Sequence, residues 1–369
     1  MIDGWKTRKE ALARHDAQYA LFGAQVHGWR SRPVALFEVE AFEARHGLRL
    51  PAAYRAWITE VGVGAGPFYG FTGLPDDDAA GVGRPFPHDA EYLDEEGLPE
   101  GVDARDGTLV LTDHGCGYED LLVLSGPHAG EVWIDFRSAE GPLRPWYESF
   151  EAYMEAWLRR TEVEWAIDTI GDWKPFAPEA GFLAQARASM DALLHGGRDP
   201  MCGEYPLPAD GLFITLARLH MADGDLDQAQ AAFGQAADFA YSREGTAALG
   251  DCALAVYRGD QQARLDAALG GLGAEDVGWD VRIRLHREAI AALDALGRAD
   301  EALQQRIALA EADDDNVDAQ LDVVQVLLAR GQLAEAADFL RAVAESGGDD
   351  WDDDEDDEDD EDDEDDEDD

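Results

Sequence analysis

Hydrophobic residues along this chain follow two periods, and each predicts a different element. A period near 3.6 residues places apolar side chains on one face of a helix. It runs through TRKEALARHDAQYALF, FEVEAFEARHG and PAAYRAWITEV, the last beginning at Pro51, a residue suited to a first helical turn. We therefore expect the first sixty residues or so to be mainly helical.

The period then changes to two. GTLVLTDHG, EDLLVLSG and GEVWIDFRS are short β-rich runs separated by glycine-bearing links, as consecutive antiparallel strands are. A further helix, YESFEAYMEAWLRRTEVEWAI, follows and places large apolar residues on one face. These residues are Phe150, Tyr153, Met154, Trp157 and Leu158. The pattern predicts an α+β domain over residues 1–170, with an antiparallel sheet covered by helices.

Beyond GDWKPFAPEAG, whose prolines and glycines suggest a linker, strand patterns fade and alanine-rich helices take over. Four segments each place a glycine between two helical runs, with spacings of 35, 38 and 34 residues: Gly224, Gly259, Gly297 and Gly331. This period resembles that of tetratricopeptide repeats, in which paired helices stack into a solenoid. We expect a tetratricopeptide-like all-α solenoid over residues 171–347.

The first and last of these copies fit the repeat family best, at its turn and second-helix positions. The matching residues are Gly224, Leu226, Ala229, Phe233 and Ala236 in the first copy and Gly331, Leu333, Ala336, Leu340 and Val343 in the last. In the middle copies Arg264 and Arg306 stand where the family prefers a small or apolar residue. The sequence therefore predicts a degenerate solenoid and not a strict one.

Charge narrows the possible partners. The 369 residues include 80 acidic and 29 basic ones, a formal net charge of −51. The last 21 residues, DDWDDDEDDEDDEDDEDDEDD, hold 20 carboxylates, which leaves −31 on the rest of the chain. Such a field repels nucleic acids and anionic membranes and attracts basic proteins. We therefore exclude direct nucleic-acid and membrane binding and expect a basic protein partner.

The acidic segment over residues 348–369 is predicted to be disordered. It offers little apolar area to offset an ordering cost of roughly 1–2 kcal/mol per residue. Two functions remain open for it: binding basic protein or loosely held cations, or only keeping the protein soluble. Asp353, Asp354 and Glu355 represent this segment among the candidate contact residues.

Targeting, redox and cofactor signals are few. No apolar run approaches the roughly 20 residues of a membrane-spanning helix, and the N-terminus lacks a basic start followed by an apolar stretch. We expect a cytoplasmic protein. Cys116, Cys202 and Cys252 lie far apart, which favours reduced thiols, and His114 with Cys116 is the only close His/Cys pair. We predict neither a metal nor another cofactor.

The stretch GVGAGPFYG, residues 62–70, packs four glycines and a proline into nine residues. A phosphate-binding loop needs its glycines after a strand and before a helix, followed by Lys and by Ser or Thr. Here the glycines follow a helix, lead toward an apparent strand FYGF, and have no Lys, Arg, Ser or Thr among them. We expect a joint that ends the helix and carries the chain into a strand.

The same region carries a family resemblance. LRLPAAYRAWITEVGVGAGPFYGF, with its Leu-Pro, Tyr54, Trp57 and glycine-rich exit, resembles the opening of the SMI1/KNR4 family of the SUKH superfamily. LVLTDHGCGYEDLLVLSGPHAGEVWIDFRS resembles that family's strand block, and ESFEAYMEAWL resembles its closing helix. The resemblance covers roughly residues 30–160, and the acidic insert LPDDDAAGVGRPFPHDAEYLDEEGLPEGVD within it matches little.

The resemblance implies a non-enzymatic protein-binding domain. Bacterial members of the superfamily are associated with immunity against polymorphic toxins, many of them nucleases, and fungal members act as regulatory hubs. An acidic binder suits the first role, because it can cover the basic nucleic-acid site of a nuclease. The hypothesis is an immunity protein that captures a basic toxin domain stoichiometrically. The alternative is a scaffold or regulatory adaptor whose helical repeats hold a peptide or helix.

Candidate contact residues are aromatic side chains beside the glycine joint and carboxylates of the acidic loops, which cannot all be buried unpaired. A solvated surface is the alternative for the carboxylates. The candidates are Tyr69, Phe71, Asp76, Asp77, Asp78, Glu95, Glu96, Glu119, Asp120, Asp353, Asp354 and Glu355. DHGCG, residues 113–117, could suggest a cysteine nucleophile, but a hairpin turn explains its glycines. We predict no catalytic residue and no enzyme.

Overall fold

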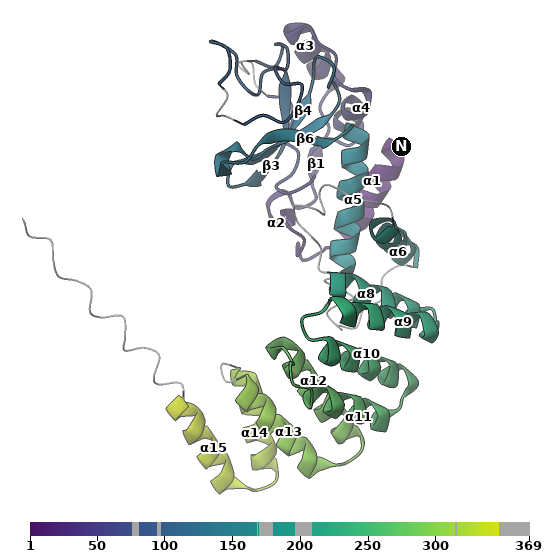
Figure 1. Ribbon diagram of the computed structural model, residues 1–369, viewed down its shortest axis with the longest axis vertical. Coiled ribbons are helices and arrows are strands. Elements are labelled where there is room, and N and C mark those ends of the chain that lie inside the picture. Colours follow the sequence, from purple (N-terminus) through teal and green to yellow (C-terminus); the bar gives the residue numbers. More distant parts are fainter. Residues whose placement is uncertain are drawn as a thin grey trace, which may run out of the picture. The chain divides into compact units, whose positions relative to one another are not determined.

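The computed structural model describes residues 1–75, 81–93, 97–167, 169, 180–195, 209–313 and 316–346. The chain separates into two compact units, Met1–Leu219 and His220–Asp369. The first contains a sheet with helices beside it, and the described part of the second is helical (Figure 1). This confirms the predicted fold class of an α+β domain followed by helical repeats. The acidic segment 348–369 lies outside the described residues.

The first unit contains most of the helices expected from the sequence. They are α1 (Ile2–His15), α2 (Ala24–His27), α3 (Leu36–His46), α4 (Ala52–Glu60), α5 (Phe150–Ala166) and α6 (Ala180–His195). The Ser149 hydroxyl caps α5 by accepting a hydrogen bond from the Ala152 amide at 3.1 Å. Helix α6 packs against α5, so the compact unit extends beyond residue 170. The predicted domain boundaries themselves stay predictions.

The first helix is shorter at its C-terminal end than the pattern over residues 7–22 predicts. Helix α1 ends at His15, and the Asp16 carboxylate accepts hydrogen bonds from the Ala20 amide at 2.7 Å and from the Trp29 indole at 2.9 Å. An Asp side chain that bonds a nearby backbone amide competes with helix formation. Asp16 therefore turns the chain out of the helix while the apolar pattern continues.

Four antiparallel strands form the main sheet, in the order β3-β4-β5-β6. They are β3 (Thr108–Gly115), β4 (Tyr118–Val123), β5 (Val132–Asp135) and β6 (Leu143–Tyr147). The three predicted strands are confirmed. Strand β6 was not predicted, because LRPWY is short and contains Pro145, which is tolerated only at a sheet edge such as this one.

Apolar clusters cover both faces of the sheet. On one face Leu122 and Ile134 belong to the large core that includes Trp5, Trp57 and Phe150 from α1, α4 and α5. The other face has its own cluster, in which Phe86 and Tyr92 pack with Leu121, Val123, Trp133 and Leu143. Phe86 and Tyr92 come from the acidic insert that matches little of the family pattern. That insert therefore supplies the cover of the second face.

The glycine-rich stretch 62–70 is a backbone crossing point. A two-residue ladder pairs β1 (Ser31–Arg32) with β2 (Val63–Gly64), inside this stretch. Gly62 has φ +115°, and a Cβ there would lie 2.3 Å from the carbonyl carbon of Arg32. The predicted joint is confirmed. The expected strand FYGF is wrong: Pro67 to Gly70 form a turn, and Phe71 alone forms isolated bridges, to Gly64 and Thr112.

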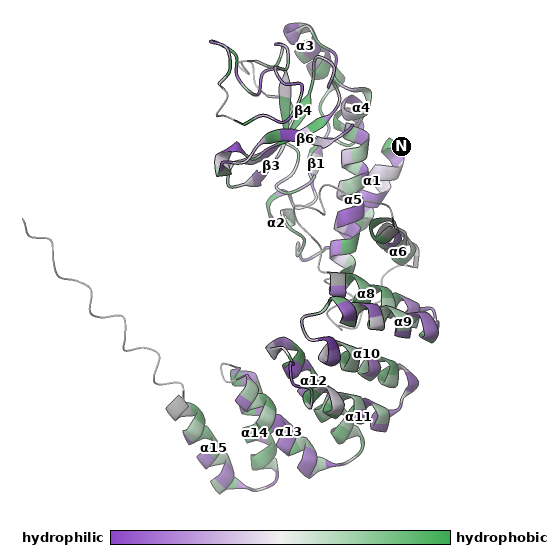
Figure 2. Cartoon of the chain, viewed as in Figure 1, coloured by the Kyte–Doolittle hydropathy of each residue, from purple (hydrophilic) through white to green (hydrophobic). Residues whose placement is uncertain are grey.

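The second unit is a series of antiparallel helices. After α8 (Ala209–Ala222), which contains the boundary between the units, come α9 (Leu226–Phe239), α10 (Arg243–Arg258), α11 (Gln261–Leu272), α12 (Trp279–Ala295), α13 (Ala299–Ala312), α14 (Val317–Ala329) and α15 (Leu333–Ser346). From α9 onward each helix packs against the next, and α10 also contacts α12. Hydrophilic and hydrophobic residues alternate around these helices, as in amphipathic helices that stack (Figure 2).

The four repeat glycines lie between paired helices, as the sequence predicts, and all are left-handed. Gly224, Gly259, Gly297 and Gly331 have φ of +79°, +71°, +72° and +75°. Each lies between the two helices of a pair, where a left-handed residue ends one helix and opens the turn to the next. The predicted helical repeats are confirmed.

Candidate functional site

The structure places the described candidate contact residues in different environments. Tyr69 is 40% exposed and Phe71 only 4%. The Phe71 ring lies in the core, 6.0 Å from the ring centres of both Trp57 and Phe150. Glu119 is partly exposed and forms an ion pair with Arg105. Eight further acidic candidates lie outside the described residues: Asp76, Asp77, Asp78, Glu95, Glu96, Asp353, Asp354 and Glu355.

Asp120 is completely buried. Its carboxylate accepts a hydrogen bond from the Tyr153 hydroxyl at 2.5 Å and lies 2.9 Å from Nε2 of His114. Burial and the neighbouring carboxylate raise the pKa of Tyr153 well above its usual value, so the phenol stays protonated. Asp120 thus ties β4 to β3 and α5 and has no exposed surface for a partner.

In DHGCG, residues 113–117, His114 and Cys116 lie in different environments. The His114 ring points toward Asp120 in the interior, whereas Cys116 is exposed in the β3–β4 turn with φ +55°. A cysteine nucleophile requires a base within hydrogen-bond reach. The imidazole of His114 is directed toward Asp120 and is not placed to act as a base for Cys116.

A candidate surface that sequence reasoning missed lies on the second unit. Connections between antiparallel helices alternate between the two ends of the stack, so the links α9–α10, α11–α12 and α13–α14 share one end. Four large apolar side chains at these links are exposed to 62–96%: Phe239, Tyr241, Trp279 and Val317. We call these four residues the inter-repeat edge.

Two contacts connect neighbouring links of the inter-repeat edge. The Tyr241 ring lies 4.0 Å from the position that a Cβ on Gly278 would occupy, directly beside Trp279. The Trp279 indole in turn donates a hydrogen bond to the Ala312 carbonyl at 2.8 Å, next to the link that leads to Val317. These contacts connect the link at Tyr241 with the link at Trp279, and the latter with the C-terminal end of α13.

Carboxylates border this strip. Exposed acidic residues lie within three positions of each link residue, namely Asp238, Glu244, Asp276, Asp280 and Asp318. Two arginines, Arg243 and Arg282, lie in the same stretches, and Asp238 binds Arg243 at 2.7 Å. The border keeps an excess of negative charge, which favours a partner with basic residues around an apolar segment.

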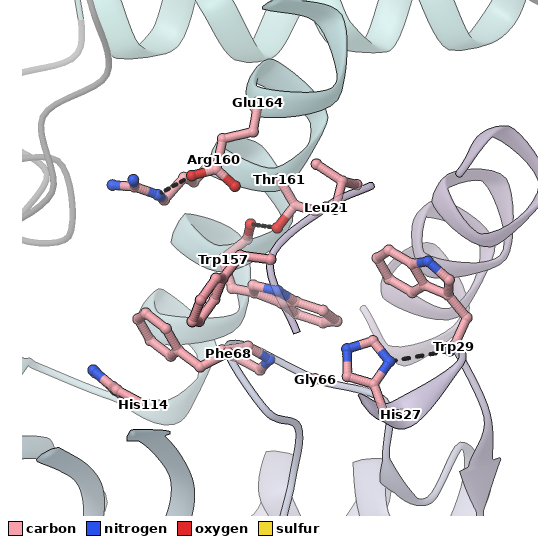
Figure 3. Close-up of a pocket in the computed structure, with 12 residues that line it drawn as sticks. Leu21, His27, Trp29, Gly66, Phe68, His114, Trp157, Arg160, Thr161 and Glu164 are labelled. Atoms are coloured by element: carbon pink, nitrogen blue, oxygen red, sulfur yellow. Dashed lines mark hydrogen bonds and ion pairs between the residues drawn. The ribbon is translucent and has the colours of Figure 1, made fainter. Parts of the chain in front are cut away.

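A second candidate site is a pocket in the first unit, beside the glycine joint (Figure 3). Its cavity measures about 190 Å³. The walls come from the segment before β1, the glycine joint, β3 and α5, and the aromatic contributors include Phe22, Trp29, Phe68 and Trp157. Phe22 is 61% exposed, and its ring centre lies 5.4 Å from that of Tyr69. Tyr69, predicted as a contact residue, therefore neighbours the pocket mouth.

The described residues contain neither a cluster of metal-ligating side chains nor a membrane-spanning helix. Among the described residues no group of three or more His, Cys, Asp and Glu side chains is placed to hold a metal ion. No helix in the described ranges is long and apolar enough to cross a bilayer.

The fold and the exposed strip define a chain with an α+β unit followed by stacked helical pairs. No protein-family model matches it. Its sequence matches no curated protein. Among solved structures the chain is similar to one described as "MamA AMB-1 C2221", at 15% identity, over 51% of this chain and 97% of that one, with a TM-score of 0.27. The SMI1/KNR4 resemblance stays a prediction.

Proposed function

We propose that this chain is a non-enzymatic adaptor whose helical repeats bind a basic, partly apolar segment of another protein along the inter-repeat edge. The observation that carries the proposal is the exposure of Tyr241, at 96%, and of its neighbours Trp279 and Val317. Large contiguous apolar patches with a polar rim are uncommon on monomeric proteins and mark interaction sites. Tyr and Trp are also the side chains that contribute most to binding energy.

Charge selects the class of partner. The carboxylates beside the strip attract Lys and Arg, while an acidic segment would meet like charges. A helix or an extended peptide with apolar residues flanked by basic ones suits this surface. Its apolar residues would contact the inter-repeat edge, and its basic residues would pair with the bordering carboxylates. This is the adaptor alternative from the sequence, with the inter-repeat edge as its proposed binding surface.

The test is selection from a displayed library of peptides of about 15 residues with varied charge, followed by affinity measurement on single peptides. We expect enrichment of peptides with Lys or Arg flanking large apolar residues. Replacing both Tyr241 and Trp279 by Ala should weaken the selected peptide at least about tenfold, the effect of losing one hot spot of 1.4 kcal/mol or more.

Tyr257→Ala provides the matched control. Tyr257 is half exposed and lies near Gly224, at the opposite end of the helix pairs. Its replacement should change affinity less than about twofold, as expected for a side chain outside the interface. Enrichment of acidic peptides, or equal losses in the Tyr257 variant and the edge variant, would refute the proposal.

Neutralisation of a basic toxin domain remains the second candidate function. It is favoured by the charge of −31 outside the acidic segment, which suits capture of a strongly basic partner. Tyr69 and Glu119 are the described residues proposed for that contact. A toxin domain titrated with this chain should lose activity in proportion and reach zero at one equivalent. Residual activity at several equivalents would reject neutralisation but leave peptide binding by the repeats untouched.

A further inference from the structure

The aromatic pocket of the first unit has the size and lining of a site for one ring. A cavity of about 150 Å³ with apolar walls is sufficient to bind benzene, and this one measures about 190 Å³. Trp29, Phe68 and Trp157 line it, and aromatic side chains favour stacked or edge-to-face contact with another ring. Figure 3 shows the His27, Phe68 and Trp157 side chains gathered around the same space.

Trp29 is held in place at some conformational cost. Its φ of +57° is left-handed, a conformation that is unfavourable for a bulky residue. Three hydrogen bonds hold it there. Its amide donates to Nδ1 of His27 at 3.0 Å, its carbonyl accepts from Nζ of the buried Lys9 at 3.0 Å, and its indole donates to Asp16 at 2.9 Å.

Phe68, which also lines the pocket, has a left-handed backbone too and is held by ring stacking. Its φ is +50°, and its ring stacks on the His114 ring with the centres 3.4 Å apart. His114 is oriented by buried Asp120, at 2.9 Å. Two strained aromatic residues that face one cavity, both over-determined by their surroundings, indicate a preorganised binding site.

His27 places a hydrogen-bond donor at this cavity. Nδ1 of His27 accepts the Trp29 amide proton, so a neutral His27 ring carries its own proton on Nε2. Burial, with a smaller effect from nearby Lys9, lowers the pKa of His27 to about 4, so the ring is neutral at pH 7. Figure 3 shows the second ring nitrogen on the side that faces Phe68. The pocket thus presents an N–H to whatever occupies it.

The charged side chains that line the pocket form an ion pair with each other. Arg160 binds Glu164 at 2.6 Å, and the Thr161 hydroxyl donates to the Trp157 carbonyl at 2.8 Å. A charged ligand would have to break an existing pair or remain without a counter-charge. These contacts favour a neutral ligand.

We propose that this pocket binds one neutral aromatic ring that carries a hydrogen-bond acceptor, with the ring between Trp29, Phe68 and Trp157 and the acceptor on Nε2–H of His27. Phe22 at the mouth covers the bound ring. The ring belongs either to a small molecule or to a tyrosine of another protein. The site lies entirely within the first unit and does not depend on peptide binding by the repeats.

The experiment measures binding of three probes to the full chain by ligand-detected NMR and tryptophan fluorescence. Acetophenone has both ring and acceptor, ethylbenzene lacks the acceptor, and cyclohexyl methyl ketone lacks the aromatic ring. Acetophenone should bind at least about fivefold more tightly than either, since one ring contact or one hydrogen bond contributes about 1 kcal/mol. Equal affinities for the three probes, or no saturable binding of acetophenone, would overturn the proposal.

Phe22→Ala locates the binding without threatening the fold, because Phe22 is mostly exposed. This substitution should lower the affinity for acetophenone about fivefold, because it removes one ring contact. The matched control is Phe37→Ala in α3, where the side chain is 70% exposed and lies outside the pocket lining. Equal effects of the two variants would contradict the assignment.

A blocked Gly-Tyr-Gly tripeptide separates the two sources of the ring. Tighter binding than acetophenone identifies a tyrosine of a partner protein, and weaker binding identifies a small molecule. Either result, with the Phe22 dependence, supports a site for one ring.

Discussion

Gly70 and Gly126 both have positive φ, +99° and +76°, but their surroundings differ. A Cβ on Gly70 would lie 2.0 Å from the Gly64 carbonyl oxygen, a backbone atom held in the β1–β2 crossing. At Gly126 nothing lies within 4 Å of such an atom. The glycine joint therefore needs Gly70 for two reasons, conformation and space, whereas Gly126 is needed only for conformation.

Gly70→Ala should accordingly lower the free energy of unfolding by about 3 kcal/mol or more, and Gly126→Ala by about 1 kcal/mol, the cost of a left-handed alanine. Urea unfolding of the two variants beside the unchanged protein measures the difference. Equal destabilisation would show that the backbone near Gly64 moves to accommodate the methyl group. The crossing would then not be sterically tight at Gly70.

Individual side chains near this crossing could not be placed from the sequence. Tyr69 and Phe71 are two positions apart and would share a face in a regular strand. The left-handed residues Phe68 and Gly70 redirect the chain, so Tyr69 is exposed while Phe71 enters the core. Asp120 was placed at the surface because its buried partner Tyr153 lies 33 positions away in the sequence. Local pattern carries no information about such a pair.

Elements were predicted well where local residues determine them. The repeat glycines end helices through their own φ preference, and strands β3, β4 and β5 are short β-rich runs separated by glycine-bearing links. Strand β6 is defined by its pairing with β5. Its short sequence, which contains Pro145, gives no local indication of that pairing. The inter-repeat edge did leave a signal: Tyr241, Trp279 and Val317 recur every 38 residues in links that should be polar.

The departures from the repeat pattern also have a reason at this scale. Arg306 on α13 binds Asp294 of α12 at 2.6 Å and Asp322 of α14 at 2.8 Å, so it joins three successive helices. Arg264 on α11 binds Glu288 of α12 at 2.6 Å in the same manner. These arginines link neighbouring helices through charge where the repeat family uses small or apolar residues.

Replacing Arg306 by Ala should therefore destabilise the second unit by about 1–2 kcal/mol, because a mostly buried guanidinium and two carboxylates lose their partners. Arg341→Ala is the control, since the ion pair described for Arg341 is with exposed Asp338, within one helix, and its loss should cost no more than about 0.5 kcal/mol. Thermal unfolding of both variants makes the comparison. Similar shifts would mean that Arg306 does not couple the three helices.

At the scale of the whole molecule, charge and apolar surface should control different steps of binding. The net charge of −51 acts over about a Debye length of 8–10 Å and accelerates the approach of a basic partner, mainly through the association rate. The inter-repeat edge acts only at contact, and loss of contact mainly raises the dissociation rate. Ending the chain at Gly348 removes 20 carboxylates and leaves the edge residues in place.

For a selected basic peptide, that truncation should lower the association rate at low salt and leave the dissociation rate within about twofold. Raising the salt should erase the difference between the two chains, because screening removes the long-range field. Tyr241→Ala should do the reverse, with faster dissociation at every salt concentration and little change in association. Stopped-flow kinetics of all three chains distinguishes these outcomes. If truncation instead accelerates dissociation as strongly as Tyr241→Ala, the acidic segment is itself a contact surface and the edge is not the principal one.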